Sequence, residues 1–439
     1  MLISTSVIVF VVVFVATLTI ITIAYVLLKT MRQATKNTSV EQERTLNLTS
    51  DSIMDSWYQV VVENENIDDK DFISTLKQTY PGLISIVFER WCNLQCMHCF
   101  YEMERVTASQ YDIYGIEDIL QNLVKQISSE KECHLLHAGR ILRKWHIPVL
   151  RNIQKTNSGV KIGLIDNGSY TRLINEINLS GLLFDWIDIS LDGTSETHNK
   201  QRDNQNAFKM ALRGLSKAKN ILKKEGQLTA LFTLTTINSH SVSETIDIAL
   251  EYADEFHLSL ISPRIGQQHL VPGISDIEKM WNSAVNAKKI YGKEKVMIRI
   301  YHTRDFEKLS HVVGHKTISQ SLTSALVIPE TAGLLLDINN INVSFFPSSL
   351  WPKEEIIIDA DGSYRMGYFG QFTLAELQSG HSKSGQNTLP YTISKLDKAS
   401  KIVDLYPKCV ETWWNLLGKN KFHDEIKTFQ TIMKGGERL

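Results

Sequence analysis

Short β-branched runs alternate with longer amphipathic stretches from residue 83 to residue 262, and this alternation constrains the fold more than any other feature. The β-branched runs predict strands over residues 83–88, 134–137, 160–165, 186–191, 228–236 and 255–262. The amphipathic stretches predict helices over residues 116–127, 147–155, 170–178, 207–223 and 241–252. Such alternation is typical of a parallel sheet covered by helices. We therefore predict an α/β fold, a partial (β/α)6 TIM-like barrel with its functional groups at the carboxyl ends of the strands.

The length of 439 residues allows two or three domains. We place the barrel domain at residues 81–305 and an α+β extension at residues 306–439. Within the extension, residues 355–359 and 363–368 flank the turn pair Asp361-Gly362, which predicts a β-hairpin. Residues 30–80 are interpreted as a polar linker followed by a helical segment.

The amino-terminal segment carries no charged side chain from Leu2 to Leu28. A helix of about 20 apolar residues crosses a bilayer, so residues 1–29 are predicted to form a transmembrane anchor. Lys29, Arg32 and Lys36 follow directly, and the positive-inside rule places this flank in the cytoplasm. A cleaved signal peptide is the alternative, although no positive side chain precedes the run. We predict a single-pass membrane protein whose catalytic domain is cytoplasmic.

Charge and cysteine content narrow the classes of function. The net charge is −1, and no basic run is interleaved with aromatic residues, which argues against nucleic-acid binding. Five cysteines in a chain of this length are too few for a secreted disulfide scaffold. Three of them, Cys92, Cys96 and Cys99, lie within eight residues just after the first predicted strand. Such clustering indicates a metal site in a reducing compartment.

The C-x3-C-x2-C spacing supplies three thiolates where a closed site needs four. A structural zinc site has four ligands, and a closed [4Fe–4S] cluster has four cysteines. Three thiolates therefore leave one iron of a cluster open to an external ligand. His98 is adjacent to Cys99 and would strain a chelate. A structural alternative stays open, because positions i, i+4 and i+7 share one helix face and cysteines can serve as small buried hydrophobes.

This loop resembles the cluster loop of the radical S-adenosylmethionine (SAM) superfamily, over the segment Cys92-Asn93-Leu94-Gln95-Cys96-Met97-His98-Cys99-Phe100. The histidine before the last cysteine and the aromatic residue after it are common in the peptide- and protein-modifying branch. The resemblance implies a [4Fe–4S] cluster whose open iron binds SAM. It also implies reductive cleavage of SAM to a 5′-deoxyadenosyl radical, a peptide or protein substrate, and an electron donor such as flavodoxin or ferredoxin.

A second motif extends the resemblance along the fourth predicted strand, as Ile187-Asp188-Ile189-Ser190-Leu191-Asp192-Gly193 followed by His198 and Arg202. In the family, the matching serine and arginine contact the SAM carboxylate, and a guanidinium pairs well with a carboxylate. The resemblance therefore implies that Ser190 and Arg202 bind SAM. The structural alternatives are a capping role for Ser190 and a solvated charge at a helix start for Arg202.

The resemblance places three more residues at the SAM site. Asn167, in the sequence Ile165-Asp166-Asn167-Gly168, matches a Thr-Asn-Gly turn of the family, although Asn-Gly is a turn signal in any protein. Phe100 follows the last cysteine of the cluster loop, and Gly139 lets the backbone approach a ligand closely at the end of the second strand.

The second predicted strand departs from the family pattern. Relatives end it with Gly-Gly-Glu, whose acid accepts a hydrogen bond from the SAM amino group, but this chain has His137-Ala138-Gly139-Arg140. A guanidinium has no acceptor and cannot replace the glutamate. A non-catalytic, membrane-anchored binding or scaffold protein is therefore the alternative to an active enzyme. A zinc-binding regulatory protein is a third possibility, which needs a fourth ligand that the sequence does not supply.

The remaining cysteines indicate one cluster only. The extension resembles the SPASM or twitch domain that relatives append for auxiliary clusters, with its cysteines lost. Cys409 is the one cysteine in it, and a single thiol cannot hold a cluster. Cys133 begins the second predicted strand and is expected in the core.

Overall fold

A computed structural model describes residues 82–88, 91–99, 113–129, 132–137, 141–263, 266–322, 326–328, 333–345, 355–358 and 364–366. Every described residue belongs to the unit Met54–Leu439. The predicted anchor and linker lie outside the described residues, as do Cys409 and the predicted SAM-site residues Phe100 and Gly139. Among the described helices, none is both long and apolar enough to cross a membrane.

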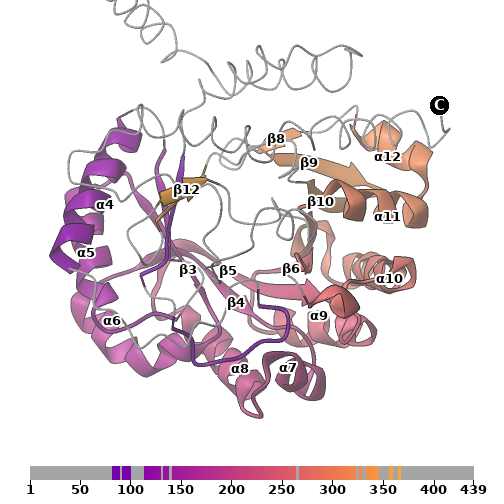
Figure 1. Ribbon diagram of the computed structural model, residues 1–439, viewed down its shortest axis with the longest axis horizontal. Coiled ribbons are helices and arrows are strands. Elements are labelled where there is room, and N and C mark those ends of the chain that lie inside the picture. The colour runs from indigo at the N-terminus through magenta and orange to yellow at the C-terminus, as the bar shows by residue number, and fades with distance from the viewer. Residues whose placement is uncertain are drawn as a thin grey trace, which may run out of the picture. The chain divides into compact units, whose positions relative to one another are not determined.

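The described strands form one sheet whose centre is a series of parallel strands (Figure 1). Seven strands lie side by side in chain order, and each pairs in parallel with the next. They are β1 (Leu83–Ile86), β2 (His134–His137), β3 (Lys161–Asp166), β4 (Phe184–Ser190), β5 (Leu222–Leu234), β6 (Glu255–Leu260) and β7 (Val296–Ile300). The prediction of an α/β fold with a parallel sheet is confirmed, and the parallel series runs one strand further than the six predicted.

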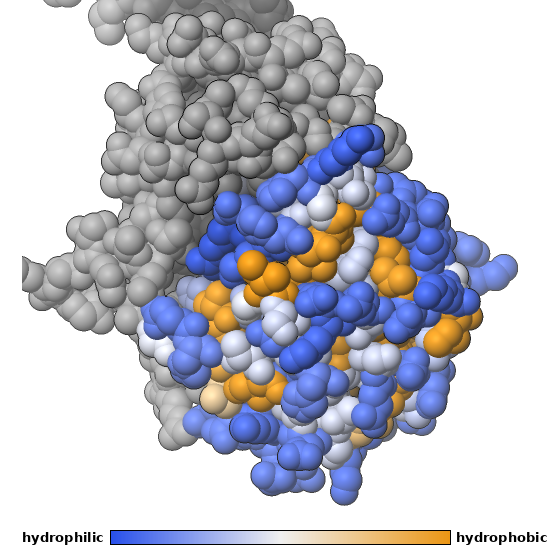
Figure 2. Space-filling view, turned by 90° about the vertical axis from the view of Figure 1, so that its right-hand side faces the viewer, coloured by the Kyte–Doolittle hydropathy of each residue, from blue (hydrophilic) through white to orange (hydrophobic). Residues whose placement is uncertain are grey.

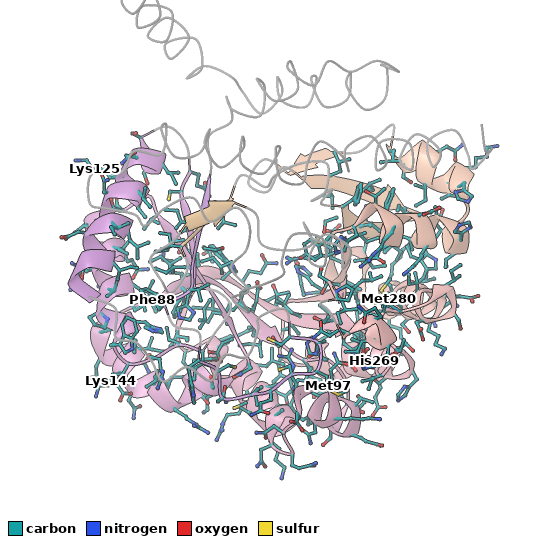
Figure 3. The ribbon with its side chains drawn as sticks, viewed as in Figure 1. Phe88, Met97, Lys125, Lys144, His269 and Met280 are labelled. Atoms are coloured by element: carbon teal, nitrogen blue, oxygen red, sulfur yellow. The ribbon has the colours of Figure 1, made fainter. Side chains whose placement is uncertain are left out.

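Helices connect successive strands and form an outer layer around them (Figure 1). In Figure 3, Phe88 lies inside this layer, whereas Lys125 and Lys144 lie at its outside. The α-helices are α4 (Ile113–Ser128), α5 (His146–Thr156), α6 (Ile174–Ser180), α7 (Ser195–Arg202), α8 (Ala207–Ala218), α9 (Val242–Leu250), α10 (Ile274–Tyr291), α11 (Thr303–Val313) and α12 (His315–Leu322). Short 3-10 turns are η2 (Ser169–Leu173), η3 (Ser239–Ser241), η4 (Gln268–Leu270) and η5 (Lys293–Lys295).

The outer surface of this helical layer faces solvent. Figure 2 shows the side that lies at the right of Figure 1, where hydrophilic residues surround small hydrophobic areas. Large hydrophobic side chains are exposed singly, as at Ile274 and Ile290 of α10. Scattered exposed apolar residues of this kind are normal on a protein surface.

Five predicted strands agree with the structure to within two residues at each end, and β2 agrees at both ends. The exception is β5, which begins at Leu222 instead of residue 228. The helix predicted over residues 207–223 ends at Ala218, so this prediction was too long. The charged residues Lys223 and Lys224 belong to the partly exposed start of β5, where the pairing with β4 shifts register. Their polarity was mistaken for the solvent face of a helix.

Later strands extend both edges of the sheet. At one edge, β10 (Ile341–Phe345) pairs in parallel with β7, and β9 (Gly333–Ile338) and β8 (Leu326–Ile328) follow in antiparallel order. At the other edge, β11 (Glu355–Ile358) pairs in parallel with β1, and β12 (Tyr364–Met366) pairs antiparallel with β11. The predicted hairpin near Asp361-Gly362 is confirmed. The domain boundaries at residues 81, 305 and 306 stay predictions.

The two faces of the sheet carry different side chains. Alternate residues of the central strands are aliphatic or aromatic and fully buried, among them Ile187, Ile189, Phe232, Phe256 and Leu258. These residues form the core under the helices, because successive side chains of a strand point to opposite faces. The residues between them form an inner face that is largely polar, with Asp188 on β4, Thr229 on β5 and His257 on β6.

One close contact on the inner face shows how tightly the strands are packed. The register pairs Gly163 of β3 with Trp186 of β4. A Cβ atom at Gly163 would lie 1.9 Å from Cε2 of the Trp186 indole. The indole therefore occupies the space that any other side chain at position 163 would need.

We expect Gly163→Ala to lower the free energy of unfolding by about 1–3 kcal/mol, because the added methyl group must displace the indole. Gly159→Ala is the matched control, since no atom lies within 4 Å of its added Cβ. Thermal unfolding of the full chain measures both variants. Equal unfolding midpoints for the two would contradict the packing described.

Candidate functional site

The three clustered cysteines lie in a loop after the carboxyl end of β1. Cys92, Cys96 and Cys99 are half-buried and outside any disulfide. The loop is held from two sides. The Met97 backbone amide donates to the Gln201 carbonyl of α7 at 2.9 Å. The side-chain amide of Gln267, a residue that follows β6, donates to the Met97 and Cys99 carbonyls at 2.7 and 3.2 Å. The prediction that the cysteines follow a strand at the carboxyl edge of the sheet is confirmed.

An apolar cluster covers one side of the cysteines. Leu94, Ala207 and Met210 are buried together, and Cys92 and Cys96 pack against them. Leu94 belongs to the loop itself, whereas the other two residues lie on α8. This contact shields the sulfur atoms from water on that side.

Asn167 makes polar contacts with Cys92 and its neighbour Asn93. The Asn167 amide donates to Asn93 Oδ1 at 2.9 Å and lies 3.9 Å from Cys92 Sγ. Asn167 is buried at the end of β3 and accepts a hydrogen bond from the Ser169 amide at 3.1 Å. Gly168 has a φ of 90°, and its Cβ would lie 2.2 Å from the Met210 carbonyl oxygen. The predicted Asn-Gly turn is present, and its glycine is required by both the backbone angle and the close approach of α8.

Buried charges surround Cys96. Arg202, at the end of α7, donates from Nε and Nη2 to Asp192 Oδ2 and from Nη1 to Cys96 Sγ at 3.5 Å. Asp192 is fully buried and Arg202 is 9% exposed. Burial alone would raise the pKa of Asp192, but Arg202 and the neighbouring histidines hold that pKa below its usual range. The guanidinium therefore bridges a carboxylate and a cysteine sulfur.

Residues of several other elements also contact Asp192. The Thr233 amide of β5 donates to Asp192 Oδ1 at 2.8 Å, and the Asn238 side-chain amide donates to the Asp192 carbonyl at 2.9 Å. The Asp192 amide donates to His198 Nδ1 at 2.8 Å. His98 Nε2, from the cysteine loop, lies 3.5 Å from Asp192 Oδ2. Burial lowers the pKa of His98 to about 4, so this histidine is neutral at neutral pH.

The thiols lie close enough to influence one another electrically. Burial raises the pKa of Cys96 to about 11, Arg202 opposes that shift, and Cys99 and Cys92 add to it. A bound metal would remove these protons outright, because a coordinating thiol is deprotonated. A single zinc ion requires sulfur atoms within about 4.6 Å of each other, twice the Zn–S bond of about 2.3 Å. In the described part of the chain no three His, Cys, Asp or Glu side chains are placed to hold a single ion.

The predicted SAM-site residues fall into three groups. Ser190 is half-buried at the carboxyl end of β4, and its hydroxyl makes no hydrogen bond within the described residues. Arg202 and Asn167 lie beside the cysteines, each with its contacts made to protein atoms. Phe100 and Gly139 lie outside the described residues. The solvated-charge alternative for Arg202 is wrong, because the side chain is buried in an ion pair.

Several residues that organise the site were not singled out from the sequence. Asp192 is the centre of the buried network, and Asn93 and Gln267 position the cysteine loop. Thr235 and Asn238 are both fully buried and hydrogen-bonded to each other. Cys133 is fully buried, which confirms its expected place in the core.

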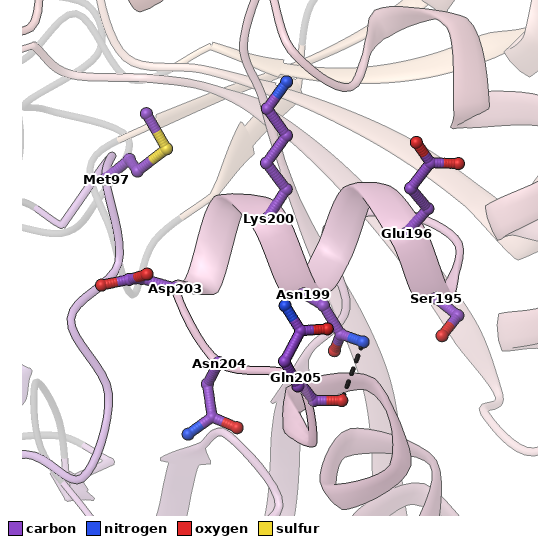
Figure 4. Close-up of a pocket in the computed structure, with 8 residues that line it drawn as sticks. All are labelled: Met97, Ser195, Glu196, Asn199, Lys200, Asp203, Asn204 and Gln205. Atoms are coloured by element: carbon purple, nitrogen blue, oxygen red, sulfur yellow. Dashed lines mark hydrogen bonds between the residues drawn. The ribbon is translucent and has the colours of Figure 1, made fainter.

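A hollow of about 780 Å³ lies beside the cysteine loop (Figure 4). Its lining comes from α7 and the segment after it, with Met97 of the loop at one side. Lys200, Glu196 and Asp203 give it charges of both signs. Met97 is 39% exposed and directly follows Cys96, so it brings solvent close to the cysteines.

Comparison with known proteins gives a family for the central part of the chain. Residues 86–250 match the model described as the Radical SAM superfamily. The chain carries a radical SAM domain. This match covers the cysteine loop, Asn167, Ser190, Asp192 and Arg202, so the resemblance noted from the motifs is confirmed. No curated protein matches the chain.

Solved structures of radical SAM enzymes are similar at low identity. Streptococcus suis SuiB bound to S-adenosylmethionine is 10% identical, with 85% of this chain and 78% of that chain covered and a TM-score of 0.48. Native anSMEcpe with bound AdoMet is 14% identical, with 79% and 82% covered and a TM-score of 0.42. Coproporphyrinogen III oxidase (HemN) from Escherichia coli is 13% identical, with 52% and 57% covered and a TM-score of 0.37.

We expect Asp192→Asn to destabilise the radical SAM domain by about 3–5 kcal/mol, because it leaves the buried Arg202 guanidinium without its counter-charge. Asp337→Asn is the matched control. It removes the exposed ion pair with Lys293, and such a pair contributes about 0–1 kcal/mol. Chemical unfolding of both variants checks the difference. A loss at Asp192 no larger than that at Asp337 would show that the buried network does not hold the domain together.

Proposed function

We propose that the chain is a radical SAM enzyme that holds one [4Fe–4S] cluster on Cys92, Cys96 and Cys99 and modifies a peptide or protein. The observation that carries the proposal is a set of three half-buried thiols at the carboxyl end of β1, inside a radical SAM domain. When bound on these cysteines, a [4Fe–4S] cluster would supply the electron for reductive cleavage of SAM to methionine and a 5′-deoxyadenosyl radical, which would take a hydrogen atom from the substrate. The peptide or protein substrate rests on the resemblance of the cysteine loop to the peptide-modifying branch.

The residues around the cysteines suit a reduced, electron-rich group. Leu94 and Met210 keep water from one side of the sulfur atoms. Arg202 donates to Cys96 Sγ, and the Asn167 amide points to Cys92 Sγ. Hydrogen bonds to the sulfur ligands are among the factors that set the potential of an iron–sulfur cluster. We infer that these two side chains ease reduction of the cluster by stabilising the added negative charge.

Ser190 is the residue best placed to receive SAM. Its hydroxyl lies at the carboxyl end of β4, next but one to Asp192, and has no hydrogen bond within the described residues. Arg202 already donates to Asp192 and to Cys96. A role for Arg202 at the SAM carboxylate would therefore use its remaining N–H groups, and Ser190 would supply the first hydrogen bond.

The partners and location follow from the sequence. The apolar run at residues 1–29 would anchor the enzyme in a membrane, with the radical SAM domain in the cytoplasm. An electron donor such as flavodoxin or ferredoxin would reduce the cluster. Exposed Met97, beside the hollow of Figure 4, gives such a donor a short approach to Cys96.

A non-catalytic scaffold is the second candidate function. Arg140 stands where relatives have the glutamate that accepts the SAM amine, and Arg202 is engaged by Asp192. Both features would weaken SAM binding without disturbing the fold. Turnover of SAM by the purified protein separates the two candidates.

The first test replaces cysteines one at a time. After anaerobic reconstitution, the wild type should hold about four iron atoms per chain and release 5′-deoxyadenosine from SAM under reducing conditions. Cys96→Ala should lose the cluster and the product. Cys133→Ala is the matched control, because Cys133 is fully buried directly before β2, outside the cysteine loop, and should change neither readout.

Three results would contradict the proposal in different ways. Iron bound equally well by Cys96→Ala would place the cluster elsewhere. Iron near eight or twelve atoms per chain would show auxiliary clusters. An intact cluster without 5′-deoxyadenosine would favour the scaffold.

The second test concerns Ser190. We expect Ser190→Ala to raise the dissociation constant of SAM about tenfold, the effect of losing one hydrogen bond to a charged group. Ser216→Ala is the control, because Ser216 is exposed on α8 and bonds only to its own helix. Equilibrium dialysis with labelled SAM at equal iron content measures both, and an unchanged constant for Ser190→Ala would remove this residue from the site.

A further inference from the structure

Polar side chains with unmet hydrogen bonds gather on the inner face of the sheet, on strands far from the cysteine loop in sequence. On β7, Val296, Ile298 and Ile300 are buried under the helices, so Arg299 between them points to the inner face. Arg299 is the register partner of Ser259 on β6 and of Ser344 on β10. Register partners on parallel strands point to the same face. Arg299 and Ser344 therefore lie side by side near the carboxyl ends of their strands.

Three buried polar atoms of this group have no hydrogen-bond partner among the described residues. They are Arg299 Nε, Ser344 Oγ and His257 Nδ1. Ser344 is 1% exposed and His257 is 4% exposed. A buried polar atom that makes no hydrogen bond is costly, so these three atoms require an explanation.

The protonation of His257 defines what it can bind. Its Nε2 lies 2.8 Å from Glu255 Oε2, and a carboxylate can only accept a hydrogen bond. Burial, followed by the charge of Arg299, lowers the pKa of His257 to about 4, so the ring is neutral at neutral pH. Nε2 then carries the single proton, and Nδ1 is a bare acceptor that needs an N–H or O–H donor.

Two acidic side chains lie on the same inner face of the sheet as Arg299, Asp188 on β4 and Glu255 on β6. Burial raises the pKa of Asp188 to about 6, and the charge of Arg299 opposes this shift. Glu255 on β6 is hydrogen-bonded to His257. Within the described chain, no ion pair or hydrogen bond joins Arg299 to either acid or to any other residue. The guanidinium is thus held on an inner face beside two carboxyl groups without being paired to them.

We propose that Arg299, Ser344 and His257 bind a carboxylate that has a neighbouring N–H group, as at the carboxyl terminus of a peptide. The guanidinium and the Ser344 hydroxyl donate to the carboxylate, and His257 Nδ1 accepts the N–H. This inference rests on the proposed function, since it makes the group part of the substrate site. The carboxyl ends of β6, β7 and β10 lie at the same edge of the sheet as the cysteine loop after β1, where barrels of this kind bind their ligands.

The test measures the binding of three peptides to the reconstituted full-length protein. The probes are acetyl-triglycine with a free carboxylate, its carboxamide, and an amide-capped peptide with one internal glutamate. Calorimetry should show binding of the free acid and none of its carboxamide. The third peptide distinguishes an acidic side chain from a peptide terminus as the source of the carboxylate, and we expect it to bind more weakly than the free acid.

Variants separate binding from structural support. Arg299→Gln should weaken binding of the free acid about tenfold or more, whereas Arg213→Gln, which removes an exposed arginine of α8, should leave it unchanged. Asp188→Asn should strengthen binding, because it removes a negative charge near the guanidinium. A purely structural role for Arg299 would not produce that gain. If Arg299→Gln does not fold, Arg299→Lys keeps the charge, loses the two-pronged contact and should weaken binding in the same direction.

The outcomes also distinguish this inference from the proposed function. Arg299→Gln should release 5′-deoxyadenosine from SAM without peptide at the wild-type rate, because Arg299 is not among the cysteine or SAM residues. If the wild type binds the carboxylate but does not cleave SAM, the proposed enzymatic function is wrong and the proposed binding site still stands. Equal binding of the free acid and its carboxamide, or equal binding by wild type and Arg299→Gln, would overturn the inference.

Discussion

Arg202 donates to Asp192 and to the sulfur of Cys96, and the site depends on this buried pair more than on any other contact. The guanidinium links the end of α7 to the cysteine loop, and Asp192 links both to β5 through the Thr233 amide. Each charge would be costly if it were buried alone. Together they fix the position of Cys96 and give its sulfur a charged donor. A substitution of either residue would therefore affect the position of the cysteines as well as the stability of the domain.

The parallel sheet explains why residues so distant in sequence meet. The cysteine loop follows β1, Asn167 ends β3, Ser190 ends β4, and Arg299 lies near the end of β7. Parallel strands bring all these carboxyl ends to one edge, and the apolar face beneath the helices supplies the core that holds them. The inner face is thereby left to polar residues. In this arrangement one edge would serve the cluster and SAM, and the far strands of the same face would serve the substrate.

The sequence predicted the parts that depend on local pattern. The strand–helix alternation located β1 to β6, and β2 agrees at both ends. The cysteine spacing located the loop, and Asp361-Gly362 located the hairpin of β11 and β12. The prediction was wrong at Lys223 and Lys224, two charged residues that lie at the start of a strand and not at the end of a helix. Periodicity cannot distinguish an exposed strand start from a polar helix face.

Other features could not be read from pattern because they depend on strand order and register. The short strand β7 and its neighbour β10 place Arg299 beside Ser344, although the two residues are far apart in sequence. The central position of Asp192 depends on contacts from β5, α7 and the cysteine loop at once. The motif around Asp192 was visible, but its partners were not. Similarly, Ser190 and Arg202 belong to one motif, and only the structure shows that the hydroxyl is available while the guanidinium is engaged.

Electron paramagnetic resonance of the reduced, anaerobically reconstituted protein, recorded with and without SAM, tests whether the cysteines hold a cluster with an open iron. We expect the signal of a single [4Fe–4S] cluster whose g values change when SAM is added, because SAM would bind the iron that lacks a cysteine. A signal that SAM leaves unchanged would contradict an open iron, and a protein that contains no iron would contradict the cluster itself.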